Sequence, residues 1–161
     1  MKKFSNFKFL GALALMFTLA FTSCVDPCKD VACVNGECVE GDCVCDTGYE
    51  GTLCDALMQT KFVGNYNLDE ICDSGSDNYA ATITASATNI EGISINNLYD
   101  SGLNTTATVS SSTITIESQT FGNGTISGTG SINTDETVIN INYTVTVGGQ
   151  TDACIATLTK Q

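Results

Sequence analysis

The most reactive side chains in this sequence are its nine cysteines, and seven of them lie between Cys24 and Cys54. A cysteine thiol can be acylated as a nucleophile, form a disulfide or bind a metal ion. The chain has no histidine, so the commonest general base and the commonest metal ligand are both missing. Serine, threonine and aspartate are numerous, but no histidine and no obvious lysine base lies beside them. We therefore expect no catalytic residues and no enzymatic activity.

Two pairs of adjacent carboxylates, Asp69-Glu70 and Asp135-Glu136, are the remaining candidates for acid–base chemistry. Adjacent residues of a strand point to opposite faces, so we expect neither pair to act together. At strand ends such residues are usually solvated. The glycine pairs of residues 122–124 and 128–130 precede no helix, which argues against a phosphate-binding loop. We expect no cofactor.

Acidic residues strongly outnumber basic ones in the chain. Its 161 residues include 18 Asp and Glu against 6 Lys and Arg, which gives a formal charge of −12. Such a surface repels nucleic acid, so we expect no nucleic-acid partner. The same charge attracts cations or basic partners.

The N-terminus has the pattern of a secretory signal peptide over residues 1–23. Met1–Lys8 contains three lysines and no acidic residue, and the apolar run Phe9–Phe21 follows. The run is 13 residues long, whereas a membrane-spanning helix needs roughly 20, so we expect a cleaved signal and not a permanent span. Cleavage would leave all 18 acidic residues and only three lysines, a formal charge of about −15.

The residues Phe21-Thr22-Ser23-Cys24 resemble the lipobox of bacterial lipoproteins, with Phe in place of the usual Leu. The resemblance implies that Cys24 becomes the mature N-terminus and carries palmitate-type acyl chains, which anchor the protein to a membrane. Val25 at the next position implies the outer membrane of a Gram-negative bacterium. The alternative is ordinary cleavage with Cys24 left free. The odd number of cysteines in an exported chain favours lipidation.

Six cysteines follow within residues 26–55, a stretch too short to fold on apolar burial alone. In an oxidising compartment we expect them to form disulfides, although six cysteines allow fifteen pairings and their spacing does not choose among them. The C-x-C motif lacks a second pair of the C-x-x-C type, so we expect no zinc. The six residues are Cys28, Cys33, Cys38, Cys43, Cys45 and Cys54.

The segment from Cys43 to Cys54 reads C-x-C-x-x-G-Y-x-G-x-x-C and is similar to the C-terminal half of an EGF-like domain. Four residues separate Cys38 from Cys43, as in the tenascin-type variant. The resemblance implies three bridges, namely Cys28–Cys38, Cys33–Cys43 and Cys45–Cys54. Val25-Asp26-Pro27 lacks the acidic run of calcium-binding members, so we expect no calcium site. Directly after an anchor we favour a spacer role over protein contact.

Beyond a short linker, Asp55–Thr60, apolar residues alternate with Thr, Ser and Asn, which is the period of half-buried strands. Turn signals separate the strands, and we predict a mainly β fold: an eight-stranded antiparallel meander barrel over residues 61–161, with a β-sandwich as the alternative. The predicted strands are Lys61–Ile71, Tyr79–Ala87, Glu91–Leu98, Thr105–Ser110, Thr113–Glu117, Gly124–Ser131, Thr137–Val147 and Asp152–Thr159.

The two remaining cysteines are Cys72, at the end of the first predicted strand, and Cys154, at the start of the last. Barrel closure brings these strands together, so we expect a disulfide between them. The segment Phe62–Tyr66 contains the G-x-Y motif and resembles the first strand of lipocalin-like barrels. We expect core packing more than a ligand pocket from seven inward residues, namely Phe62, Tyr66, Ile83, Ile114, Ile116, Ile139 and Ile141.

Together these features predict an exported, membrane-anchored lipoprotein without enzymatic activity. Its EGF-like module would space a β-barrel from the membrane, and the barrel would interact with a protein or a surface. The alternative is a carrier that holds a small apolar ligand inside the barrel.

Overall fold

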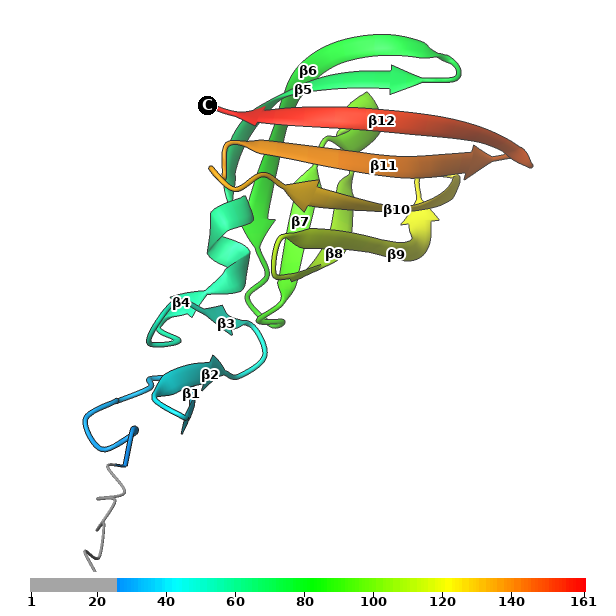
Figure 1. Ribbon diagram of the computed structural model, residues 1–161. Coiled ribbons are helices and arrows are strands. Elements are labelled where there is room, and N and C mark those ends of the chain that lie inside the picture. The colour runs from blue at the N-terminus through cyan, green and yellow to red at the C-terminus, as the bar shows by residue number, and fades with distance from the viewer. Residues whose placement is uncertain (1–25) are drawn as a thin grey trace, which may run out of the picture.

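The computed structural model describes residues 26–161, so the predicted signal peptide and lipidation site, residues 1–23 and Cys24, lie outside the described residues. The described chain consists of small hairpins followed by a closed, eight-stranded antiparallel barrel (Figure 1). The predicted barrel is therefore confirmed, and the β-sandwich alternative is wrong. Between residues 26 and 161, no helix has the length and apolar character needed to cross a membrane.

Residues 26–57 form a disulfide-rich unit, here called the cysteine module. Its four short strands pair as two antiparallel hairpins, and a left-handed Glu40-Gly41 turn joins the first two. Three disulfides connect Cys28 to Cys38, Cys33 to Cys43 and Cys45 to Cys54, which is the pairing that the resemblance implies. The strands are β1 Gly36–Val39, β2 Asp42–Cys45, β3 Tyr49–Glu50 and β4 Ala56–Leu57.

The barrel strands follow the chain as an up-and-down meander, and the last strand, β12, pairs with the first, β5. Each predicted strand has its counterpart, with boundaries that differ by a few residues. The strands are β5 Gly64–Cys72, β6 Gly75–Ala85, β7 Gly92–Asn96, β8 Asn104–Ser110, β9 Thr113–Phe121, β10 Gly124–Ile132, β11 Val138–Val147 and β12 Gln150–Lys160.

At the ends of two predicted strands, the residues belong to 3-10 segments instead. Lys61 and Phe62 belong to a 3-10 helix, η1 (Met58–Phe62), and not to the first strand. Leu98 belongs to a second 3-10 segment, η2 (Leu98–Asp100). Both Phe62 and Leu98 are fully buried, because these turns place an apolar side chain over an end of the barrel. Buried apolar residues just outside a strand can therefore continue its alternating pattern and make the predicted strand too long.

Alternation along the strands fills the barrel interior. In β11, Ile139, Ile141, Tyr143 and Val145 are buried, and the Asn residues between them are exposed. All seven residues predicted for the core are at most 2 % exposed and belong to one apolar cluster. The prediction of core packing over a pocket is borne out for these side chains.

Gly128 makes room for one of the larger interior side chains. It lies directly opposite Tyr143 in the β10–β11 ladder. A Cβ atom at this position would lie 2.5 Å from both the Asn142 carbonyl oxygen and the Tyr143 Cβ, a separation that real side chains do not tolerate. A glycine is therefore required where β10 passes close to Tyr143.

The β12–β5 ladder closes the barrel. Cys154 lies directly opposite Cys72 in this ladder, and the two form the predicted disulfide. The bond joins residues 82 positions apart in the sequence. It therefore crosslinks the two strands whose pairing turns a sheet into a barrel.

The segment predicted as a linker, Asp55–Thr60, is structured. It contributes β4 and most of η1, whose Gln59 side chain is only 5 % exposed. The Met58 N–H donates to the Gly48 carbonyl oxygen over 2.9 Å, and the Tyr66 hydroxyl donates to the Phe62 carbonyl oxygen over 2.7 Å. An ion pair joins Lys61 to Glu50. The cysteine module is thus connected to one end of the barrel by packed, hydrogen-bonded structure. Figure 1 shows the module at that end.

We predict that replacing both Cys72 and Cys154 by alanine lowers the free energy of unfolding of the barrel by about 4 kcal/mol, because the crosslink across this long loop limits the conformational entropy that the chain gains on unfolding. Urea unfolding of the mature protein measures the change. The matched control is the Cys28→Ala, Cys38→Ala pair, which opens a short loop in the cysteine module and should leave the barrel transition in place. An unchanged barrel midpoint in the first variant would contradict the proposed closure.

Candidate functional site

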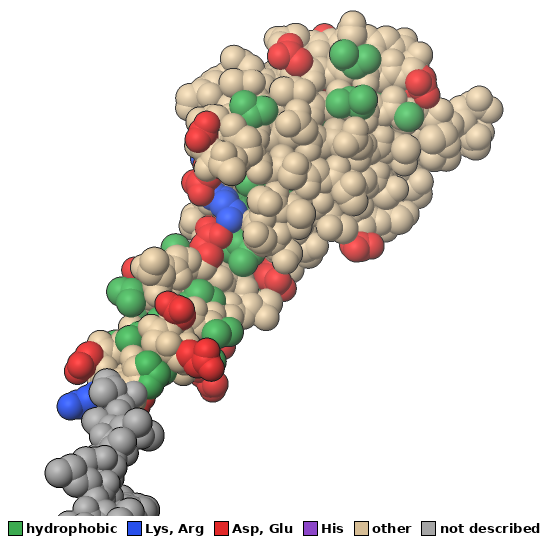
Figure 2. All heavy atoms as spheres, in the orientation of Figure 1, with side chains coloured by type: hydrophobic (Ala, Val, Ile, Leu, Met, Phe, Trp, Pro, Cys, Tyr) green, Lys and Arg blue, Asp and Glu red, His purple; other side chains and the backbone are tan. Residues whose placement is uncertain are grey.

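Polar side chains gather inside and around the barrel end that lies away from the cysteine module. This end, here called the distal rim, is formed by the β5–β6, β7–β8, β9–β10 and β11–β12 connections (Figure 1). Five carboxylates belong to the distal rim, and the three lysines of residues 26–161 all lie elsewhere. Lys29 is in the cysteine module. Lys61 and Lys160 are at the opposite end of the barrel, where the Lys160 Nζ donates a hydrogen bond to the Lys61 carbonyl oxygen. Figure 2 shows blue side chains only at the junction and in the module. The carboxylates are Glu70, Asp73, Asp77, Asp100 and Asp152.

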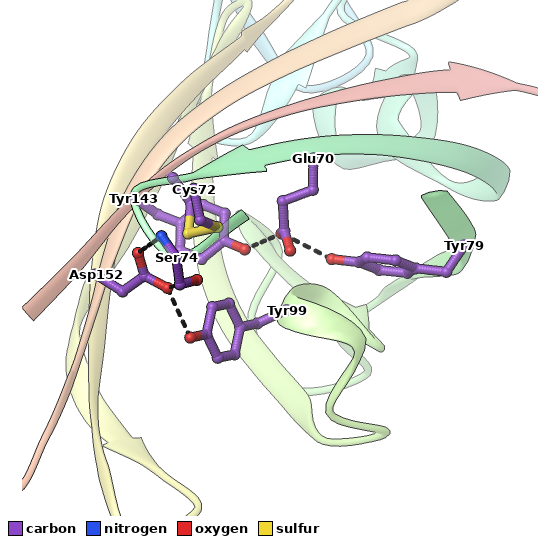
Figure 3. The surroundings of a disulfide bond; sticks show 8 residues. Glu70, Cys72, Ser74, Tyr79, Tyr99, Tyr143 and Asp152 are labelled. Atoms are coloured by element: carbon purple, nitrogen blue, oxygen red, sulfur yellow. Dashed lines mark hydrogen bonds between the residues drawn. A yellow bond between two sulfur atoms is a disulfide. The ribbon is translucent and has the colours of Figure 1, made fainter. Parts of the chain in front are cut away.

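Glu70 is the one acidic side chain that points into the barrel. It is 7 % exposed and follows Tyr66 and Leu68 on the inner face of β5. Its Oε1 accepts a hydrogen bond from the Tyr79 hydroxyl over 2.7 Å and a second from the Tyr143 hydroxyl. Figure 3 shows the two rings approaching the carboxylate from opposite sides. The two hydroxyls partly replace the water that Glu70 loses on burial.

These contacts change the acidity of the tyrosines. Burial, followed by the hydrogen bond to Glu70, raises the pKa of Tyr143 and of Tyr79 well above the usual value. Burial alone raises the pKa of Tyr66 to about 12. All three hydroxyls are therefore protonated hydrogen-bond donors at neutral pH.

Tyr99 lies across the distal rim because of an unusual loop between β7 and β8. Asn97, Tyr99 and Asp100 all have left-handed backbone angles, with φ of 69°, 63° and 41°. A non-glycine residue rarely adopts this conformation unless the surrounding contacts fix it. The Tyr99 ring packs edge-on against Tyr143 and Phe121, with centroids 6.4 Å apart in each pair. The strained loop thus holds an aromatic ring over the end of the core.

Asp152 fixes Tyr99 from the other side. Its Oδ2 accepts a hydrogen bond from the Tyr99 hydroxyl over 2.8 Å and another from the Ser74 hydroxyl, and its Oδ1 accepts from the Ser74 N–H over 3.1 Å. The Ser74 hydrogen bond, followed by that from Tyr99, lowers the pKa of Asp152. Figure 3 shows this group beside the disulfide of Cys72. The closing bridge therefore lies directly beside this hydrogen-bonded group of the rim.

Two hollows flank Tyr99 at the distal rim. One, of about 380 Å³, lies between Tyr99, Asp152 and the β11–β12 turn. The other, of about 230 Å³, lies between Tyr99 and the β5–β6 hairpin and is lined by Glu70, Asp77 and Asp100 among others. Each is large enough for one side chain or a small ligand, and each is strongly acidic.

The group of Cys72, Asp152 and Cys154 resembles a metal site but cannot act as one. Within residues 26–161, the three potential ligand atoms that lie within 4.8 Å of one another belong to Cys72, Asp152 and Cys154. The two sulfurs of this group are bonded to each other. Neither is available as a thiolate ligand.

A wider groove of about 820 Å³ follows the outer face of β5, β12, β11, β10 and β9. Ile71 and Ile155 lie side by side on this face and are 67 % and 56 % exposed. Thr, Ser and Asn contribute six of the other fourteen residues along it. The groove is open to solvent and outside the barrel, so it is not the interior cavity of a carrier.

The two pairs of adjacent carboxylates singled out in the sequence have different surroundings in the structure. Asp69 and Glu70 do point to opposite faces, as predicted, but only Asp69 is exposed. The expectation that both are solvated is wrong for Glu70, because the strand continues to Cys72. Asp135 and Glu136 are exposed in the β10–β11 connection, as expected.

Sequence reasoning missed the Glu70 and Tyr99 groups. Glu70 has a detectable signal, since it continues the Tyr66, Leu68 alternation on the buried face of its strand. No local signal identifies Tyr99, because its left-handed conformation depends on contacts with β9, β11 and Asp152.

Comparison with protein-family models, with curated proteins and with solved structures finds no match for the chain. The function therefore has to be argued from the geometry and chemistry of its own residues.

We predict that the barrel loses stability as the pH rises from about 10 to 12. Unfolded tyrosines ionise near pH 10, whereas the buried tyrosines keep their protons to a higher pH, so the unfolded state binds fewer protons in this interval and unfolding becomes easier. Below about pH 10 this contribution is fully present. Urea unfolding across the interval measures it. In Tyr66→Phe the free energy of unfolding should fall less steeply with pH, by the equivalent of about one bound proton. A stability independent of pH here would contradict the buried tyrosine assignment.

Proposed function

We propose that the protein is an exported, lipid-anchored and non-enzymatic display protein, whose cysteine module holds a filled barrel away from the membrane and whose barrel surface binds a protein partner. The observation that carries this proposal is the packed barrel interior. Twenty-two buried residues form one apolar cluster, so the barrel serves as a solid support and its binding capacity lies on its surface.

The four disulfides indicate an exported or extracellular protein, since such bonds persist in oxidising compartments. We propose that residues 1–23 direct this export and that acyl chains on Cys24 anchor the mature chain, in the outer membrane of a Gram-negative bacterium. Support comes from the basic and apolar segments before Cys24 and from the pairing of the eight cysteines of residues 26–161 with one another, Cys24 being the ninth cysteine of the sequence.

We propose that the cysteine module is EGF-like and serves as a rigid spacer. Its pairing supports this identity, and its connection to the barrel supports the role. The hydrogen bond from Met58 to Gly48, the Glu50–Lys61 ion pair and the buried Phe62 restrict movement at the junction. A stapled spacer with a structured junction would present the distal rim on the side away from Cys24.

The carrier alternative requires room inside the barrel, and the geometry disfavours it. The inner face is occupied by large side chains such as Tyr66, Ile83 and Ile116, each at most 2 % exposed. The largest hollow described above is on the outer face. A ligand inside the barrel would have to displace packed side chains at a cost of several kcal/mol.

We predict that Cys24→Ser releases the exported protein from the membrane fraction into the soluble fraction, because the acyl attachment site is removed. Fractionation of cells, followed by mass analysis of the mature N-terminus, measures the change. The control is Ser23→Ala, which keeps the thiol and a small residue before it, and should stay in the membrane fraction. A Cys24→Ser protein that still partitions into membranes would rule out the lipid anchor.

A further inference from the structure

The hollow between Tyr99 and the β5–β6 hairpin contains a buried carboxyl group to which no described side chain adds a cation. Glu70 lines this hollow and is more than nine-tenths buried. Its Oε1 accepts both tyrosine hydrogen bonds, and within residues 26–161 no hydrogen bond reaches its Oε2. Buried carboxylates are normally paired with a cation. Here the lysines of the described chain lie at the junction and in the module, so no described side chain supplies that cation.

The surroundings of Glu70 fit an organic cation better than a metal ion. Asp77 and Asp100 line the same hollow and add negative charge, and the Tyr99 ring forms one wall. Aromatic rings attract ammonium and guanidinium groups through their faces. A divalent metal needs several oxygen ligands converging on one point, whereas the only convergent trio among residues 26–161 includes the two disulfide sulfurs.

We propose that this hollow binds an ammonium or guanidinium group, with Glu70 as its buried counter-ion and Tyr99 as its aromatic wall. Its volume of about 230 Å³ is below the range of drug-sized sites, so it suits one lysine or arginine head group or a free small amine. The inference deepens the proposed function, and it rests on that function only for the source of the cation, a basic side chain of a protein partner.

The test is an NMR titration of the mature protein with n-butylammonium and, separately, ethylguanidinium, at constant ionic strength. We expect saturable shifts of the Glu70, Tyr79 and Tyr99 signals, and none with the neutral analogue n-butanol. Glu70→Gln keeps the side-chain shape and should weaken binding at least tenfold. Glu117→Gln, an exposed carboxylate on the outer face of β9, is the matched control and should bind as the original protein does.

A second variant keeps the test decisive if Glu70→Gln does not fold. Asp100→Asn changes an exposed residue that lines the hollow, and it should weaken binding about threefold without unfolding the barrel. NMR shifts that do not saturate with added cation would overturn the site. Binding by either variant that is as tight as binding by the original protein would also overturn it. Calcium chloride that saturates the same signals more tightly than either organic cation would also overturn the organic-cation assignment.

A lysine-rich peptide distinguishes the two sources of the cation. Peptide binding that Glu70→Gln abolishes supports a partner's basic side chain. Binding of the free amine without binding of the peptide supports the site and overturns the partner side chain as its ligand. These outcomes are independent of the membrane anchor, so a failure of the Cys24 test leaves the cation site standing.

Discussion

The pairing of β12 with β5 is the constraint on which the rest of the molecule depends. It converts a meander of eight strands into a closed barrel, and closure gives every strand a buried face and a solvated face. The disulfide of Cys72 and Cys154 fixes the pairing at one point. That point lies directly beside the Ser74, Asp152 and Tyr99 contacts, so the same closure that defines the core also positions the distal rim.

The filled interior leaves the polar groups of the barrel at its surface. Apolar side chains occupy the space that a carrier would use, and the polar chemistry is concentrated where the core meets solvent at the rim. The opposite end of the barrel is taken by η1 and the cysteine module. One end is therefore joined to the cysteine module, and the other end faces solvent.

The sequence predicts the fold well because its determinants are local and periodic. Alternation along residues such as Ile139, Ile141 and Tyr143 defines the strands, and the first-to-last position of Cys72 and Cys154 predicts closure. The rim is different. The burial of Glu70 depends on where its strand ends, and the position of Tyr99 depends on three residues from distant strands. The sequence also does not predict the structured junction, because the five residues of the 3-10 helix Met58–Phe62 are too few to show a hydrophobic periodicity.

The central claim, a solid barrel that works through its surface, is tested most directly by xenon binding to the mature protein with isotope-labelled isoleucine methyl groups. Xenon enters dry apolar cavities of protein interiors and shifts the signals of the methyl groups that line them. The account predicts that the inward methyl groups of Ile83, Ile116 and Ile141, all buried in one cluster, stay unchanged under xenon pressure. Saturable shifts of all three would reveal a cavity at the centre of the barrel and contradict the account.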